Sequence, residues 1–494
     1  MILLMKPRLK KIGSIVAVLF GVLVFYILAE HVRGYWWLHR YVKQLEGQHE
    51  VLQVEPLVPK RVPDDQNAAV DLRRVQASMK PTEHLIKRVP PFRCIPGHAD
   101  PQWKQSSWNF GKTNSCNWAW IGSELESNAV TLDVIRRAIR KPGFDSGVNF
   151  IRSVFPSFDD ETSVFKLLDA SVLYSLSMSR TEDAYRDLLL MIKLCVCHMR
   201  EPFLNEYSTR LRYFGMLYNT MWNALQYPNW TDAQLAGLSE AWATCNFEKD
   251  LISATEMTRA LHLRRFRSIR DSREKMEQYI SSFDRLPFDS ERDIGRFATS
   301  GWFLHFVNIP LWRMAWGDLD ELKELSNWQQ LINLERFYSS NSYTTIAIGK
   351  VNVDALFPIN KNWISWFDRF RFILSEPHFG EYYEYLLQET FKAQTQVEML
   401  RAAIAIQRYR LKNGDAVPPS LEALVPGFLP SLPQDRMIGS PLSYHVTAKN
   451  EFLLYSVGSN GINNNGNPTP ASPGIPYRNL WDGQDAVWYL PNKK

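Results

Sequence analysis

The sequence predicts a mainly α-helical protein with a single N-terminal transmembrane helix, an irregular stack of helical hairpins and a small α+β domain at its C-terminus. Three observations predict this fold class: an uncharged apolar run near the N-terminus, apolar residues at helical spacing through the middle of the chain, and strand-like segments between turn formers near the end. We expect five parts, which are a basic cytoplasmic leader at 1–11, the transmembrane helix at 12–29, a tether and irregular lead-in at 30–126, a helical body at 127–387 and the α+β domain at 388–494.

The transmembrane prediction comes from residues 12–29, IGSIVAVLFGVLVFYILA, which carry no charge. At about 1.5 Å per residue this run nearly spans a hydrocarbon layer of roughly 30 Å. Glu30, Arg33 and three aromatic residues at 35–37 follow it, whereas a cleavable signal peptide would end in a small-residue cleavage site. The basic leader favours a cytoplasmic N-terminus and an extracytoplasmic body.

The composition indicates an ordinary globular protein beyond the anchor. Of the 494 residues, 45% are hydrophobic and 22% are charged, so the chain can bury a sizeable core. Most of the net charge of +5 comes from the leader, through Lys6, Arg8, Lys10 and Lys11. Because the remainder is close to neutral, we expect no nucleic-acid partner.

The lead-in offers little regular pattern. Residues 46–91 are rich in charge and proline, which predicts a tether. Cys94 and Cys116 flank a Trp- and Asn-rich stretch after it. These two cysteines either form one disulfide in an oxidising compartment or remain buried thiols.

Helical hairpins are predicted in the body. Apolar residues fall on one helix face at 164, 168, 172 and 176, and again at 184, 188, 192 and 195. Thr181 begins the second helix and Pro202 lies just past its end. Thr231 caps a later helix, with Gln234 at the capping-box position.

The sequence contains no Walker A loop, dinucleotide-binding glycine motif, zinc-protease motif, nucleophile elbow or C-x-x-C pair. The run CVCH at 195–198 resembles a soft-metal cluster. On a helix, however, residues two apart diverge by about 200°, so Cys195 and Cys197 cannot face one ion. We interpret the cysteines of this run as helix-packing residues.

Two stretches of the body allow either binding or simple packing. The first is a dense run of arginines, which either holds an acidic partner or lipid headgroups or is a solvated face paired with Glu256, Asp271, Glu274 and Glu277. Its members are Arg259, Arg264, Arg265, Arg267, Arg270 and Arg273. The second is the aromatic stretch from Trp302 to Trp316, which is either core or a binding groove.

The last hundred residues carry a specific order of motifs. A helix ending in YRLKNG precedes PPSLEALVP, LPSLPQD, GSPLSY, a predicted hairpin, LYSVGSNG and finally DGQDAVW. This order resembles the globular domain of the major pseudopilin of type II secretion systems, and the whole chain resembles bacterial membrane-anchored proteins with a helical body. The resemblance implies an α+β domain with strands at LSYHV, FLLYSV and AVWYL, in a protein of the bacterial inner membrane whose soluble part lies in the periplasm. The prepilin leader and its cleavage site are missing, so filament assembly is not implied.

The resemblance also implies a calcium site in the Asn-rich loop after FLLYSV. Asn460 stands in the position of the family's loop acid, Asp485 in that of the C-terminal Asp, and Asp482 is a nearby candidate. Calcium takes six to eight oxygen ligands, which Asn carbonyls supply without charge. The alternative is a loop held by Asn side chains that bond to neighbouring backbone.

Two functions follow from these features. We expect a non-catalytic, membrane-anchored extracytoplasmic scaffold or binding protein with partners in the cell envelope, associated with a secretion or envelope assembly. The alternative is an extracytoplasmic enzyme with its site in the helical body, around Trp302 to Trp316.

Overall fold

The computed structural model describes residues 5–78, 88–110, 114–148, 161–198, 202–283, 304–342, 371–375, 380–448, 450–470 and 481–489. The chain divides into two compact units, which we call the anchor unit and the main unit. The anchor unit comprises Met1–Val58, Glu256–Asn333 and Asn352–Glu381. The main unit comprises Pro59–Thr255, Leu334–Val351 and Tyr382–Lys494.

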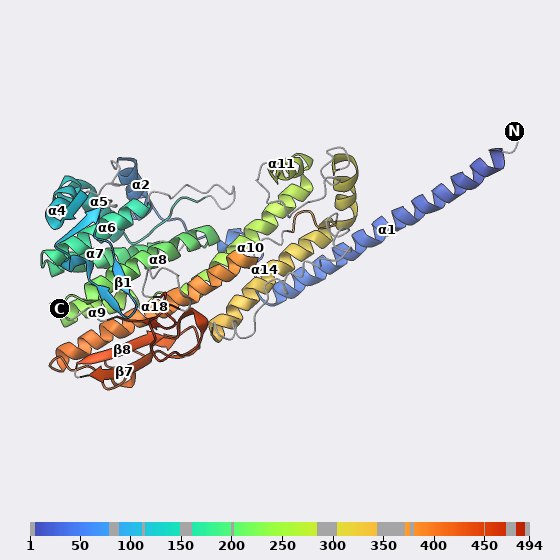
Figure 1. Ribbon diagram of the computed structural model, residues 1–494. Coiled ribbons are helices and arrows are strands. Elements are labelled where there is room, and N and C mark those ends of the chain that lie inside the picture. The colour runs from blue at the N-terminus through green and yellow to red at the C-terminus, as the bar shows by residue number, and fades with distance from the viewer. Residues whose placement is uncertain are drawn as a thin grey trace. The chain divides into compact units, whose positions relative to one another are not determined.

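Helix α1, Met5–Gly47, is the one helix in the described part of the chain that is long and apolar enough to cross a membrane. Its apolar side chains between Ile15 and Phe25 are exposed, as expected of a segment that faces lipid. Figure 1 shows this first half of α1 without neighbouring elements and its second half beside α14, Gly317–Ser340. The predicted membrane helix is therefore present as a continuous α-helix.

The same helix continues through a region where the sequence predicted a tether, and this expectation for residues 30–126 needs correction. One face of α1 is buried after residue 29. Its residues recur at helical spacing and are Glu30, Gly34, Leu38 and Leu45. Leu38 and Leu45 pack with Leu263 and Leu325. The described residues of the remaining lead-in also form regular elements. Its elements are η2 Glu55–Leu57, α2 Ala68–Ser78, the hairpin of β1 Arg93–Ile95 with β2 His98–Asp100, η3 Gln102–Lys104, and the hairpin of β3 Ser107–Phe110 with β4 Asn114–Asn117.

Further helices complete the anchor unit. The C-terminal part of α10, Phe247–Asp271, is followed by α11, Arg273–Phe283. A short helical path then leads into α14 through the π turn η5 Leu304–Asn308, α13 Ile309–Leu311 and the π turn η6 Trp312–Trp316. Pro310 lies between the two π turns, where its missing N–H interrupts the regular hydrogen-bond ladder.

The main unit contains the predicted helical hairpins. Helices α6, Glu161–Ser177, and α7, Thr181–Lys193, bury the expected apolar stripes against each other, and α9 has the expected capping box. There Thr231 Oγ1 accepts a hydrogen bond from the Gln234 N–H at 3.2 Å. The other helices are α4 Trp118–Ser127, α5 Ala129–Arg140, the π turn η4 Leu194–His198, α8 Leu204–Leu225 and α9 Asp232–Ala241.

The C-terminal region has the predicted α+β character. Helix α18, Gly380–Lys412, begins before the expected position 388, and Gly414 follows it with a φ of +60°. Strands β7 Ser443–Ala448, β8 Glu451–Ser456 and β9 Ala486–Val487 form an antiparallel sheet in that order, with Tyr444 opposite Leu454 and Tyr455 opposite Val487. The smaller elements are η7 Leu421–Leu424, β5 Gln434–Asp435, β6 Ser440–Pro441 and η8 Gly458–Asn460.

This region is not a separate compact unit. Residues from Tyr382 onward belong to the main unit together with α4–α9. Trp222 of α8 is fully buried and its indole N–H donates to the Tyr489 carbonyl at 3.1 Å. Arg408 of α18 forms an ion pair with Asp232 of α9 at 2.8 Å. The boundary predicted at 388 therefore marks a change of secondary structure within one core.

Candidate functional site

Asp485, the strongest of the predicted calcium ligands, is completely buried and is surrounded by backbone donors. Its Oδ1 accepts a hydrogen bond from Asn464 N at 3.1 Å, and its Oδ2 accepts from Gly466 N at 2.7 Å and Asn467 N at 3.0 Å. A carboxylate that accepts three backbone N–H groups has its charge stabilised by their dipoles. The Asn-rich loop is thus wrapped around this side chain.

The loop also stabilises itself through its asparagines. Asn460 Oδ1 accepts from Ile462 N at 2.9 Å, and Asn463 Oδ1 accepts from Asn465 N at 2.9 Å. These are the local side-chain to backbone bonds that asparagine makes in turns.

The third candidate, Asp482, lies near the Cys94 thiol. The pKa of this thiol is raised to about 11, mainly by burial and secondly by the negative charge of Asp482. Over the described ranges, no group of three or more His, Cys, Asp or Glu residues is arranged to hold a metal ion. Three of the roughly four lone-pair sites of the Asp485 carboxylate already accept N–H groups, so this side chain offers a cation little free coordination. These contacts favour the turn interpretation, and the calcium site stays a prediction.

A second buried carboxylate, Asp435, stands at the same end of the sheet. Its Oδ1 accepts from Met437 N and its Oδ2 from Val457 N, each at 2.9 Å. Burial raises the pKa of Asp435 to about 6, with a smaller contribution from the charge of Asp485, although the N–H donors oppose the shift. Asp435 and Asp485 together fix the two segments that follow β5 and β8.

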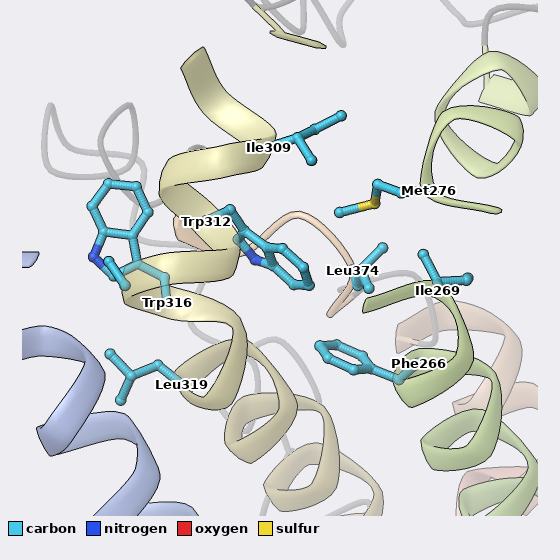
Figure 2. Packing of buried hydrophobic residues seen from close by; sticks show 9 residues of the cluster. Phe266, Ile269, Met276, Ile309, Trp312, Trp316, Leu319 and Leu374 are labelled. Atoms are coloured by element: carbon cyan, nitrogen blue, oxygen red, sulfur yellow. The ribbon is translucent and has the colours of Figure 1, made fainter. Parts of the chain in front are cut away.

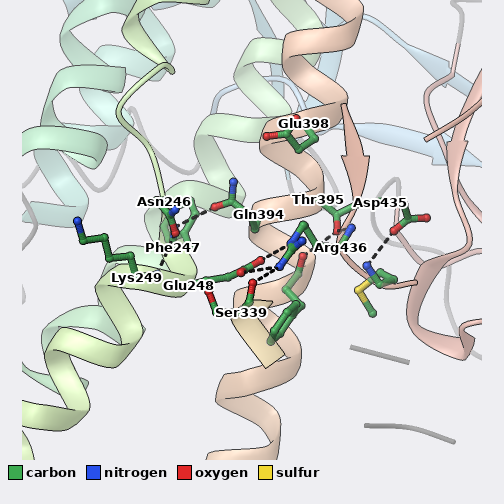
Figure 3. Close-up of polar contacts among 12 residues, drawn as sticks. Asn246, Phe247, Glu248, Lys249, Ser339, Gln394, Thr395, Glu398, Asp435 and Arg436 are labelled. Atoms are coloured by element: carbon green, nitrogen blue, oxygen red, sulfur yellow. Dashed lines mark hydrogen bonds and ion pairs between the residues drawn. The ribbon is translucent and has the colours of Figure 1, made fainter. Parts of the chain in front are cut away.

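Arg436, the next residue along the chain, joins several segments of the main unit. Its guanidinium donates to both carboxylate oxygens of Glu248, with Nε to Oε1 at 2.7 Å and Nη2 to Oε2 at 2.9 Å, and Nη2 also donates to the Ser339 carbonyl at 2.8 Å. Its backbone N–H donates to Thr395 Oγ1 at 3.2 Å. Figure 3 shows Arg436 between Glu248, Ser339 and Thr395. The backbone N–H, Nε and Nη2 of this arginine all donate to groups inside the fold, which indicates a structural clamp.

In the anchor unit, the candidate stretch Trp302–Trp316 is only partly described, since Trp302 lies outside the described residues. Trp312 and Trp316 are buried and belong to an apolar cluster with Phe266, Ile309 and Leu374. Figure 2 shows the Trp312 ring turned toward Leu374 and Phe266. These tryptophans are therefore core residues, as one of the two sequence interpretations held.

The polar centre beside this cluster is Asp320, which is completely buried. Its Oδ2 accepts from Trp312 Nε1 at 3.0 Å and from the backbone N–H groups of Ile373 and Leu374 at 2.8 and 2.9 Å, and its Oδ1 accepts from Ser375 N at 3.0 Å. Burial raises the pKa of Asp320 to about 6 against these donors. The carboxylate holds the segment 371–375 on α14.

Among the described residues, five of the six arginines in the run from Arg259 to Arg273 form ion pairs, and Arg265 lies over the Tyr279 ring. Of the acids expected as partners, Asp271 pairs with Arg270 and Glu277 pairs with Arg273. The other partners come from α14 and from the chain after α1. They are Glu50 for Arg259 at 3.0 Å, Glu55 for Arg264 at 2.9 Å, Glu321 for Arg267 at 2.7 Å, and Asp318 and Glu321 for Arg270 at 2.9 and 2.6 Å. These ion pairs attach α10 to its neighbours within the anchor unit.

The cysteines act as packing residues in the described part. Cys116 is a buried free thiol and Cys94 a half-buried one, which agrees with the second of the two alternatives for this pair. Cys195 is buried in the π turn η4, while the side chains of Cys197 and His198 lie outside the described residues.

Comparisons with protein-family models, with curated proteins and with solved structures found no match.

One membrane-proximal contact was not expected from the sequence. Glu30, at the end of the apolar run and 8% exposed, accepts from Arg33 at 2.7 Å and from Arg371 at 3.0 Å. Asp320 and Asp435 were also missed. For Glu30 and Asp320 the available signal was an acid directly after an apolar residue, Ala29 or Leu319, whereas Asp435 stands between Gln434 and Arg436 and gave no such signal.

Proposed function

We propose that the protein is a non-catalytic, single-pass membrane protein whose extracytoplasmic part binds protein partners in the cell envelope. The observation that carries this proposal is the continuity of α1. Its exposed apolar run and its buried second half form one unbroken helix. The buried face of α1 from Glu30 to Leu45 then becomes part of the core of that unit. An anchor joined in this way holds its unit at a fixed distance from the bilayer.

Three buried carboxylates of the described residues are held by the protein itself. Asp320, Asp435 and Asp485 each direct both carboxylate oxygens at donors of the chain. The alternative of an enzyme near Trp302–Trp316 gains no support here, because Trp312 and Trp316 are core and Asp320 is occupied. A general acid or base must reach its substrate, and these carboxylates do not.

We also propose a cellular location and a class of partners for the protein. We place the soluble part in the periplasm of a bacterium, outside the inner membrane, because the basic leader favours a cytoplasmic N-terminus. The long helix α18 and the sheet β7–β9 have the order that the pseudopilin resemblance implies, which supports partners in a secretion or envelope assembly.

A pull-down from membranes tests the binding function. The full chain, tagged at its C-terminus and solubilised in mild detergent after cross-linking in cells, is expected to bring down a defined set of envelope proteins in near-stoichiometric amounts. A variant with residues 13–26 replaced by a Leu-Ala span is the matched control, and it should retain the same partners because the buried face of α1 is unchanged. Recovery of the chain alone from both samples would contradict the proposal.

A further inference from the structure

The segment Leu304–Trp316 has one face in the core and one face open. Its inner face supplies Ile309, Trp312 and Trp316 to the apolar cluster of the anchor unit. On its outer face, Phe306 is 63% exposed and Met314 is 51% exposed, with Leu311 half-buried between them. Exposure alone does not identify a contact surface, since single exposed apolar side chains are common in water, so the place of these two residues relative to the apolar run of α1 decides what covers them.

The position of this segment along α1 identifies what covers it. Ile27, inside the uncharged run, packs against the same cluster as Trp312 and Trp316. A hydrocarbon layer of roughly 30 Å takes about 20 helical residues, so a layer that begins at Ile12 ends near His31. The segment therefore lies beside α1 where the helix leaves the hydrocarbon.

The charged and aromatic residues of α1 mark the same level. Glu30 forms its ion pairs with Arg33 and Arg371 there. The next turn exposes Tyr35, Trp36 and Trp37, the residue types that concentrate at the bilayer interface. The guanidinium of Arg33 lies 5.7 Å from the ring centre of Trp37.

We infer that Leu304–Trp316 is a second membrane contact, an interfacial helix that rests in the outer surface of the bilayer with Phe306 and Met314 inserted among the lipids. The occupant of this face is lipid because the segment packs beside α1 at the level of Ile27, which lies inside the uncharged run. This inference rests on the proposed membrane anchoring. It gives the anchor unit two attachments to the membrane and so restricts its tilt.

The chain offers a control on α14 within the same unit. Gly34 lies against Leu319, and Glu50 accepts from Gln329 at 3.0 Å, so α1 and α14 run away from the membrane in the same direction. Asn333 is exposed and follows Gly317 by sixteen residues, or about 24 Å along the helix. A probe at Asn333 therefore lies on the surface of the anchor unit, away from the apolar run of α1.

Site-specific photo-cross-linking tests the inference. A benzophenone amino acid replaces Phe25, Phe306 or Asn333 in the full chain, which is reconstituted in vesicles of zwitterionic and anionic phospholipid, and lipid adducts are quantified by mass spectrometry. We expect adducts at Phe25 and Phe306 in comparable yield and a yield at least tenfold lower at Asn333. Adducts at Phe25 with a Phe306 yield equal to that of Asn333 would overturn the interfacial helix and leave the anchor intact. Absence of adducts at Phe25 would overturn the anchoring itself. A diazirine amino acid at Met314 supplies a second probe with the same expectation if the Phe306 variant fails to fold.

Discussion

A Cβ atom placed on Gly34 of α1 would lie 3.1 Å from Cγ of Leu319 on α14, and 3.3 Å from the Leu319 backbone nitrogen. The two helices therefore touch through backbone at this point, directly after the membrane span. Glycine is the one residue that permits this approach without a shift of α14.

We expect Gly34→Val to weaken the anchor unit. The added side chain must push α14 away, and overpacking of this kind costs about 1–3 kcal/mol. The measurement is the thermal unfolding of the full chain in detergent. Gly21→Val is the matched control, because Gly21 has no atom within 4 Å of its built Cβ. Equal melting temperatures for the two variants would show that α1 and α14 are not packed in this way.

The ion pair of Arg436 and Glu248 leads to a second prediction. Glu248 is 7% exposed, so Glu248→Ala leaves a largely buried guanidinium without its carboxylate, and we expect a loss of about 3 kcal/mol in the free energy of unfolding. Glu277→Ala removes an exposed pair with Arg273 and should cost under about 1 kcal/mol. Urea unfolding followed by tryptophan fluorescence measures both. A Glu248 variant as stable as the Glu277 variant would contradict the clamp.

Asp435 should make stability depend on pH. Its pKa is raised to about 6 in the folded state, above the unfolded value of 3.8, so the folded state binds the proton first as the pH falls. The contribution of Asp435 to stability is thus larger below pH 4 and decreases as the pH rises through 6. We expect the stability difference between the wild type and Asp435→Asn to increase by about 2 kcal/mol from pH 7 to pH 4. A difference that stays constant, or that shrinks toward pH 4, would show that burial does not control this group.

The contacts of Asp485 predict the response to calcium. Three backbone N–H groups already bond to its carboxylate, so the full chain should melt at the same temperature with millimolar calcium and with a chelator. Asp485→Asn should lower that temperature strongly because N–H groups lose their acceptor, whereas the half-buried Asp482→Asn should change it little. A rise in the wild-type melting temperature with calcium that Asp485→Asn abolishes would instead establish the calcium site implied by the pseudopilin resemblance.

The sequence allowed prediction wherever local chemistry decides the structure. The uncharged apolar run before Glu30 has the length of a membrane-crossing helix and is helical, and Thr231 with Gln234 forms its capping box from four consecutive residues. Strands β7 and β8 also lie on short apolar runs between turn formers, where strands were expected.

Long-range pairings were not accessible in this way. Arg270 and Glu321 are 51 residues apart, and Arg436 and Glu248 are 188 apart, so the partner of each arginine depends on how helices are packed. The missed helix at 30–47 has a narrow apolar face, at Leu38 and Leu45, diluted by charged residues. This face can be identified as core only from its contacts with Leu263 of α10 and Leu325 of α14.

We propose that one apolar helix anchors the protein and leaves its soluble part outside the cytoplasm. A phosphatase that is active only after export, fused after Lys494, tests this topology most directly when its activity is measured in membranes washed with alkaline carbonate. We predict full activity in the washed membrane pellet, because in the proposed topology α1 crosses the bilayer once with its basic end in the cytoplasm. An inactive fusion, or an active one released by the wash, would contradict this topology.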